Sequence, residues 1–149
     1  MRYLAFSLFV PAALWTWSAA AEYRIMRDQG GPIEEYKAKY EAIRALGERV
    51  VIDGPCDSAC TLVLGIVPLD RICVTPRASL GFHMAYYDLA ATDGVRVVSY
   101  VQTAEFMSLY PSAVKDWLSR NGGITRYAKY ITNGPELWSI VQPCPKDVR

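Results

Sequence analysis

A short apolar strand that runs through a tight turn into an apolar helix constrains the fold of this chain most. Val50-Val51-Ile52 is typical of a buried strand, because three β-branched residues in a row suit a strand covered on both faces. Gly54-Pro55 then marks a turn. A very apolar helix is predicted from about Ser58 to Val67. This arrangement exposes Ser58 at the start of a helix.

The surrounding pattern alternates strands with helices. Tyr23–Arg27 alternates apolar and polar side chains like a short strand, and Ile33–Leu46 has the three- and four-residue spacing of an amphipathic helix. Two further strands are predicted, Arg71–Val74 and Leu80–Ala85, and the second carries His83. Strand, helix, strand, helix, strand is the order of βαβ units. It predicts an α/β fold with parallel pairing.

The second half of the chain gives weaker signals. Tyr87–Gly94 is polar and predicted to be a surface loop, and Val95–Leu109 has mixed helical periodicity. Pro111–Arg120 predicts a short helix, Ile124–Ile131 a helical or irregular segment, and Pro135–Ile140 another short helix. No internal repeat or low-complexity segment is present.

Length and charge limit the class of protein. A chain of 149 residues corresponds to one domain with a real core. The formal net charge is only +1, with 16 basic and 15 acidic residues. A nucleic-acid-binding protein concentrates lysine and arginine into a strong positive field, so nucleic acid is not expected as a partner.

The N-terminus resembles an export signal. Arg2 supplies a positive charge, Leu4–Trp17 is almost continuously apolar, and Ser18–Ala21 ends in an A-x-A cleavage pattern. Pro11 interrupts the apolar run, which favours a cleaved signal over a membrane anchor. Residues 1–21 are therefore predicted to be a signal peptide.

The mature protein would then comprise residues 22–149 and be periplasmic or secreted. An uncleaved anchor is the competing interpretation, because the apolar run is near the short limit for a membrane-spanning helix. No later segment approaches that length, so no membrane association is expected after signal cleavage.

The cysteines are Cys56, Cys60, Cys73 and Cys144. Export makes disulfides the favoured interpretation, and four cysteines allow three pairings that the sequence does not distinguish. A zinc site is disfavoured because Cys56 and Cys60 have no second ligand pair at a matching spacing. Neither a metal nor a cofactor is expected.

Ser58 and His83 are the candidate chemical groups. Ser58 lies in the turn Gly54-Pro-Cys-Asp-Ser58-Ala-Cys60, and His83 is the only histidine, 25 residues further on. A serine hydroxyl is a weak nucleophile that a histidine base can activate. The simpler alternatives are that Ser58 only caps its helix and that His83 is a hydrogen-bonded structural residue.

These segments resemble the Clp peptidase/crotonase superfamily. The resemblance is carried by Gly30-Gly31, a helix, the strand Val50–Ile52, the elbow Gly54–Ala59 and the segment Leu80–His83. It covers roughly residues 23–85 and is closest to small exported proteins similar to the Clp protease proteolytic subunit. It implies a single-domain ββα spiral, truncated relative to a full peptidase subunit, with a helical C-terminal part.

The resemblance also implies roles for individual residues. Ser58 would be the nucleophile and His83 the general base. The backbone amides of Gly31 and Ala59 would form the oxyanion hole, where preorganised donors stabilise developing charge. The substrate would be a peptide or a small acyl compound.

One expected group is missing from the pattern. The peptidases place an aspartate shortly before a terminal Pro-Glu segment, where this chain has Ala128, Lys129 and Tyr130. Asp88 or Asp93, in the loop after His83, is the alternative candidate to orient the imidazole. Without such an acid a Ser–His pair can lose several orders of magnitude in rate.

Two classes of function therefore follow from the sequence. The first is an exported serine hydrolase, and the second is a catalytically silent binding or scaffold module on the same fold. Crotonase-type thioester chemistry is disfavoured, because coenzyme A thioesters are not expected outside the cytoplasm. The natural substrate and the oligomeric state stay open, and an oligomer is compatible with the sequence.

Overall fold

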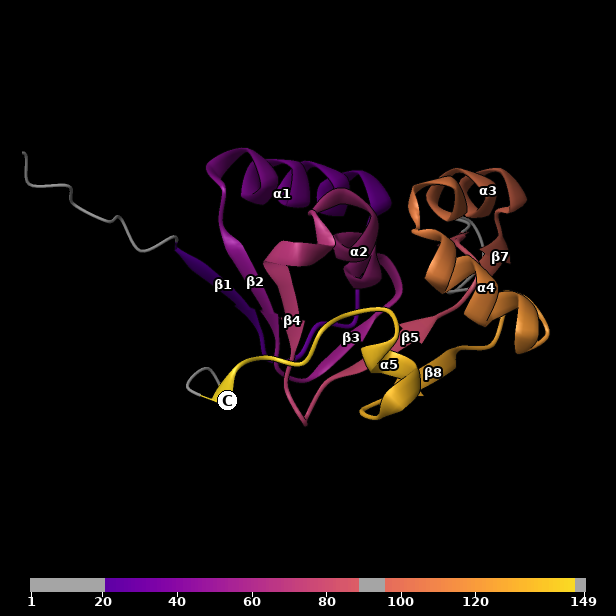
Figure 1. Ribbon diagram of the computed structural model, residues 1–149. Coiled ribbons are helices and arrows are strands. Elements are labelled where there is room, and N and C mark those ends of the chain that lie inside the picture. Colours follow the sequence, from indigo (N-terminus) through magenta and orange to yellow (C-terminus); the bar gives the residue numbers. More distant parts are fainter. Residues whose placement is uncertain (1–20, 89–95, 147–149) are drawn as a thin grey trace, which may run out of the picture.

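The computed structural model describes residues 21–88 and 96–146 of the chain, so residues 1–20 of the predicted signal peptide lie outside these ranges (Figure 1). One long helix, α1, and several short strands dominate its first half. In chain order the elements are β1 (Glu22–Ile25), α1 (Ile33–Leu46), β2 (Arg49–Ile52), β3 (Pro55–Asp57), η1 (Ser58–Leu62), α2 (Val63–Ile66), η2 (Leu69–Arg71), β4 (Ile72–Val74), β5 (Ser79–Phe82), β6 (Tyr86–Asp88), β7 (Arg96–Val98), α3 (Tyr100–Leu109), α4 (Ser112–Arg120), β8 (Lys129–Thr132) and α5 (Pro135–Trp138).

The first sheet confirms the predicted α/β class and parallel pairing. Its strand order is β1-β2-β4, and both pairs are parallel, with Tyr23 opposite Val50 and Val50 opposite Ile72. Helices α1 and α2 lie over one face of this sheet (Figure 1). Parallel neighbours need crossovers long enough to hold a helix, and the segments between these strands supply them.

Alternation along β2 divides the interior into two clusters. Val50 and Ile52 belong to the main core with the α1 residue Tyr40, whereas Val51 joins Cys73 and Cys144 in a small second cluster. Cys73 and Cys144 form a disulfide, and the C-terminal segment therefore lies along β4. Among the described residues, no helix is long and apolar enough to cross a membrane.

The second sheet contains two strands that the sequence did not predict, β3 and β8. Its order is β3-β5-β8, in which β3 and β5 are parallel and β5 and β8 antiparallel. The prediction of a helical or irregular segment over Ile124–Ile131 was therefore wrong at its C-terminal end, because Lys129–Thr132 pairs with β5. The strand predicted over Leu80–Ala85 also ends early, at Phe82, so His83 follows the strand directly.

The second half has more structure than its sequence indicated. β6 and β7 form an antiparallel pair, so the predicted loop Tyr87–Gly94 begins as a strand, and residues 89–95 lie outside the described part. The mixed segment Val95–Leu109 divides into β7 and α3, and the Ser99 hydroxyl accepts a hydrogen bond from the amide of Gln102 at the start of α3. Figure 1 shows α3 and α4 together beside β7, away from β1.

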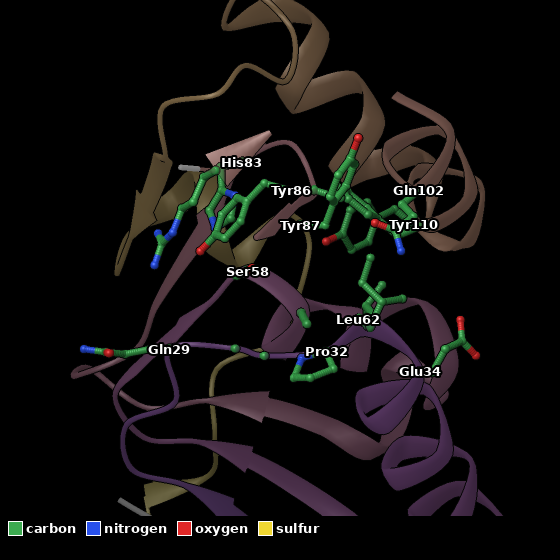
Figure 2. Close-up of a pocket in the computed structure, with 17 residues that line it drawn as sticks. Gln29, Pro32, Glu34, Ser58, Leu62, His83, Tyr86, Tyr87, Gln102 and Tyr110 are labelled. Atoms are coloured by element: carbon green, nitrogen blue, oxygen red, sulfur yellow. The ribbon is translucent and has the colours of Figure 1, made fainter. Parts of the chain in front are cut away.

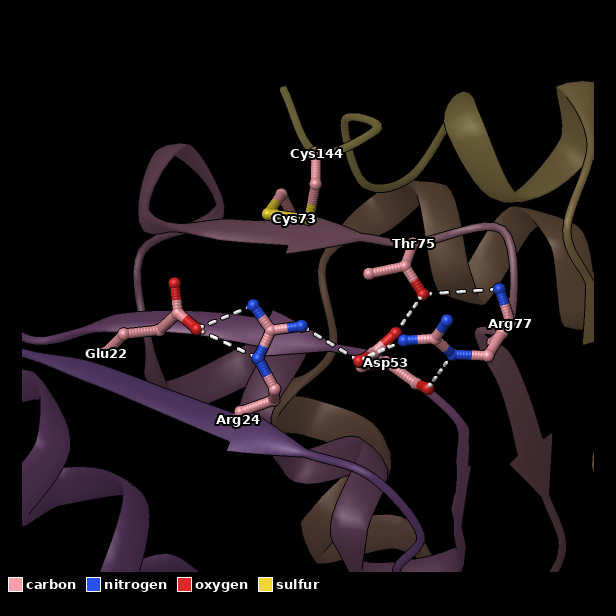
Figure 3. A network of polar contacts seen from close by, with 7 residues as sticks. All are labelled: Glu22, Arg24, Asp53, Cys73, Thr75, Arg77 and Cys144. Carbon is pink, nitrogen blue, oxygen red and sulfur yellow. Dashed lines mark hydrogen bonds and ion pairs between the residues drawn. A yellow bond between two sulfur atoms is a disulfide. The ribbon is translucent and has the colours of Figure 1, made fainter. Parts of the chain in front are cut away.

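A buried aspartate ties the first sheet to the turn after β4 (Figure 3). Asp53 directly follows β2, and its Oδ2 accepts hydrogen bonds from Arg24 at 2.8 Å and from Arg77 at 2.5 Å. Its Oδ1 accepts one from the Thr75 hydroxyl at 2.6 Å. Burial alone would raise the pKa of Asp53, but these hydrogen bonds outweigh it and lower the pKa to about 2.

Candidate active site

Four residues singled out from the sequence line one cavity of about 500 Å³. They are Ser58 and Ala59 at the start of η1, Gly31 in the loop before α1, and His83 after β5. In Figure 2, Ser58 lies between His83 and the segment from Gln29 to Pro32. The fold thus brings together residues that are up to 52 positions apart, counting from Gly31 to His83.

The backbone of Ser58 has an unusual conformation. Its φ is 56°, and among the described residues it is the one non-glycine residue with a positive φ. A left-handed residue other than glycine is strained by contact of its Cβ with the backbone, and such strain is concentrated at functional sites. It places the Ser58 side chain at a sharp turn from strand β3 into helix η1, as in nucleophile elbows.

Gly30 packs directly against this turn. A Cβ added to Gly30 would lie 2.6 Å from Ser58 Cβ and 2.8 Å from the amide nitrogen of Ala59, and the φ of Gly30 is +80°. Only glycine fits both the space and the conformation. The structure assigns close packing against the elbow to Gly30, while Gly31 also lines the cavity.

A disulfide brackets Ser58. Cys56 in β3 and Cys60 in η1 are bonded, with their Cα atoms 5.3 Å apart, and both are fully buried. The Tyr40 hydroxyl donates a hydrogen bond to the carbonyl oxygen of Cys60 at 2.9 Å. The disulfide therefore joins the residues two positions before and two positions after the strained serine, and the hydrogen bond from Tyr40 attaches them to α1.

Asp28 holds the glycine loop in place. Its Oδ1 accepts hydrogen bonds from the Gly30 amide at 2.9 Å and from the Tyr36 hydroxyl, and its Oδ2 lies 3.3 Å from Lys39 Nζ. Burial alone would raise the pKa of Asp28. The hydrogen bonds from Tyr36 and Gly30 and the charge of Lys39 outweigh burial, so the pKa is lowered. The Asp28 carbonyl also accepts a hydrogen bond from the amide of Asp57.

A backbone carbonyl orients the His83 ring. Nδ1 lies 2.7 Å from the carbonyl oxygen of Met84. A carbonyl only accepts hydrogen bonds, so Nδ1 must carry the proton, and in a neutral imidazole the basic lone pair is then on Nε2. The ring stacks on Tyr86 with centroids 5.3 Å apart. One task of a catalytic aspartate, the choice of tautomer, is therefore performed by the main chain.

Neither predicted acid is placed relative to His83 by the described side chains. Asp88 ends β6, and its side chain is outside the described part of the structure, as is all of Asp93. Among the described residues, no hydrogen bond joins Ser58 to His83. In enzymes without bound substrate such contacts are often long and tighten when substrate binds.

Sequence reasoning missed the residue next to Ser58. Asp57 ends β3, and its Oδ1 is buried without a hydrogen-bond partner among the described residues. Burial raises the pKa of Asp57, an effect that the charges of His83 and Arg27 partly oppose. The available signal was an acidic residue at the end of a strand beside the candidate nucleophile.

The inner part of the cavity is apolar and aromatic. Leu62, Phe106 and Tyr110 line it, and the rings of Phe106 and Tyr110 pack edge to face at 5.8 Å. The hydroxyl of Tyr110 is hydrogen-bonded to buried Thr61, whose hydroxyl also donates to the carbonyl of Ser58 at 2.6 Å. The cavity can therefore accommodate an apolar group beside the serine.

Comparisons with known proteins give little beyond this geometry. No protein-family model and no curated protein matches the chain. Among solved structures, it is similar to the crystal structure of a peptidase from Plasmodium falciparum, with 11% identity and a TM-score of 0.45 over 85% of this chain and 78% of that chain. The fold and the site define the class of protein. It is a mixed α/β protein with two disulfides, in which a serine and a histidine line one cavity.

Proposed function

We propose that this protein is a serine hydrolase that cleaves peptide or other acyl bonds, with Ser58 as nucleophile and His83 as general base. The observation that supports this most strongly is the left-handed backbone of Ser58, at a turn that faces the same cavity as the chain's one imidazole. A serine that only capped a helix would have an extended backbone and no need of such strain.

The proposed reaction has two steps. Ser58 Oγ attacks the acyl carbon and forms an Oγ–C bond, while its proton passes to Nε2 of His83. The amides of Gly31 and Ala59 stabilise the oxyanion. The bond to the leaving group then breaks, and the leaving group takes the proton from His83. Water repeats the sequence on the acyl-enzyme, releases the acid and restores Ser58.

The proposal is tested with a fluorophosphonate probe, which forms a covalent bond with activated serines. We expect stoichiometric labelling of the oxidised protein and complete loss of labelling in Ser58→Ala. His83→Gln should lower the rate of labelling about 10²-fold or more, because general-base catalysis typically contributes that much. Mass spectrometry of the labelled peptide identifies the modified residue.

Ser119→Ala is the matched control, because Ser119 is exposed in α4 and outside the cavity lining. It should label like the wild type. If the wild type, once shown to be folded and oxidised, fails to label, or if Ser58→Ala labels equally well, the hydrolase proposal is wrong. The silent binding module then becomes the better description of the fold.

We also propose that the fold is a truncated member of the Clp peptidase/crotonase type and that residues 1–21 are a cleaved export signal. The order of strands and helices up to β5 and the glycine loop beside the elbow support the first. The two disulfides, typical of oxidising compartments, support the second. Mass spectrometry of the expressed protein should show an N-terminus at Glu22 in the periplasmic or secreted fraction.

A further inference from the structure

We propose that Asp57 is a positioning residue whose negative charge stabilises the imidazolium of His83. Asp57 lies on β3, whereas the resemblance to peptidases predicted an acid around Tyr130. The inference rests on the proposed hydrolase function and deepens it. During attack by Ser58, His83 gains a proton, and a nearby carboxylate stabilises the resulting positive charge. No proton is transferred to Asp57, which stays ionised throughout.

The sheet register directs Asp57 toward His83. Asp57 of β3 is the parallel partner of Gly81 in β5, and parallel partners project from the same face of a sheet. His83 follows Gly81 by two residues, directly after the end of β5. The charge of His83 acts on the carboxyl of Asp57.

The absence of a side chain at Gly81 provides the space for this carboxylate. A Cβ at position 81 would lie 2.2 Å from Asp57 Oδ1 and 2.8 Å from Cε1 of Tyr130. Any other residue at this position would displace the carboxylate or the tyrosine ring. The carboxylate of Asp57 therefore lies beside Gly81 of β5, close to the ring of Tyr130.

Among the described residues, no hydrogen bond explains why one oxygen of this carboxylate is buried. Buried polar atoms are nearly always hydrogen-bonded, and an unsatisfied one destabilises the fold. Asp57 Oδ1 is buried without a partner among the described residues. The charged groups that act on Asp57 are His83 and Arg27, which favour its ionised form, and Asp28, which opposes it. A cost of this kind is understandable where the charge serves a reaction.

Two groups then share the two roles of a triad aspartate, the choice of tautomer and the supply of negative charge. The carbonyl of Met84 fixes the tautomer of His83, and Asp57 supplies charge without a direct hydrogen bond. The resemblance to peptidases placed the acid around Tyr130, in the strand β8 on one side of β5. Asp57 lies on β3, the other neighbour of β5.

Nuclear magnetic resonance tests the charge coupling without any substrate. His83 is the only histidine, so its Cε1–H resonance is unambiguous. In the wild type we expect this resonance to show a second inflection, from the titration of Asp57, at a pH above the ordinary aspartate range. The inflection should be absent in Asp57→Asn and unchanged in Asp70→Asn, which removes an exposed carboxylate in η2. Identical profiles in wild type and Asp57→Asn would overturn the inference.

A second measurement avoids any change to Asp57. In His83→Gln the positive charge that lowers the pKa of Asp57 is absent, so the carboxyl ¹³C resonance of Asp57 should titrate at higher pH than in the wild type. An unchanged titration contradicts the coupling even if Asp57→Asn proves unstable.

The kinetic test uses the same fluorophosphonate probe. Asp57→Asn should slow labelling of Ser58 by roughly 10- to 100-fold, the range of a typical coupling between two groups. The tautomer is still held by Met84, so the loss should be smaller than that of His83→Gln. An equal slowing in Asp70→Asn, or none in Asp57→Asn, is evidence against the role of Asp57. Failure of Ser58 to label at all contradicts the hydrolase function, whereas the resonance experiments still decide the coupling.

Discussion

Asp53 and Asp57 lie on either side of the Gly54-Pro55 turn and have opposite environments. Asp53, 2% exposed, accepts hydrogen bonds from Arg24, Thr75 and Arg77, and its pKa is lowered to about 2. Asp57 has a buried oxygen without a partner among the described residues, and its pKa is raised. The first carboxylate stabilises the fold, whereas the second costs stability beside the candidate nucleophile.

The same contrast holds for the two three-stranded sheets. In the β1-β2-β4 sheet, the polar network and the Cys73–Cys144 disulfide join segments distant in sequence. In the β3-β5-β8 sheet, the disulfide Cys56–Cys60 spans four positions around the strained Ser58. One region is built for stability, and the other uses local constraints to hold a costly geometry.

The largest expected effect comes from removing each disulfide in turn. Replacement of Cys73 and Cys144 by serine should lower the free energy of unfolding by about 4 kcal/mol, because this bond closes a long loop. Labelling of Ser58 by the probe should be unaffected in the fraction that stays folded. Urea unfolding and probe kinetics measure the two quantities separately.

Replacement of Cys56 and Cys60 by serine should affect the labelling of Ser58 more than the stability of the fold. The loss of stability should be smaller, about 2 kcal/mol, because the closed loop is short. Labelling should slow by roughly 10- to 100-fold, since the elbow that orients Ser58 is released. Equal effects of both pairs on labelling would show that Cys56–Cys60 has no special relation to the site.

The next effect concerns Asp53. Asp53→Asn should destabilise the protein by about 2–3 kcal/mol at pH 7, because hydrogen bonds to a charged carboxylate are lost. The pKa of Asp53 is about 2 in the folded state against an ordinary 3.8, so its contribution is fully present above about pH 4. The difference between variant and wild type should therefore shrink as the pH falls from about 4 to 2. Urea unfolding across this range checks the sign.

The smallest effect is the opposite response at Asp57. Its pKa is raised in the folded state, so the ionised carboxylate costs stability at neutral pH, and the cost disappears as the pH falls through that raised pKa. Asp57→Asn should stabilise the protein at pH 7 by roughly 0.5–1 kcal/mol, the gain typical of relieving a costly functional group. The gain should vanish in acid. A loss of stability at pH 7 would show that Asp57 is structural, like Asp53.

Local patterns predicted the first half of the fold well. The helix α1 was predicted with its observed bounds, and the strand over Val50–Ile52 and the parallel pairing were confirmed. The strand Lys129–Thr132 was missed because its pairing partners in β5 lie 47 to 53 positions earlier, from Phe82 opposite Lys129 to Ser79 opposite Thr132. Strand propensity depends on such partners and not on local sequence alone.

The sequence by itself determined the α/β architecture, the cysteine content and the choice of Ser58 and His83, because periodicity, turn residues and a single histidine are local properties. Only the tertiary structure decided the disulfide pairing, the left-handed backbone of Ser58 and the hydrogen bond from His83 to a carbonyl. It also decided that a buried oxygen of Asp57 lies beside Gly81 of β5. Charge and strain at a site depend on which groups the folded chain brings near one another, and that is fixed by packing between distant segments.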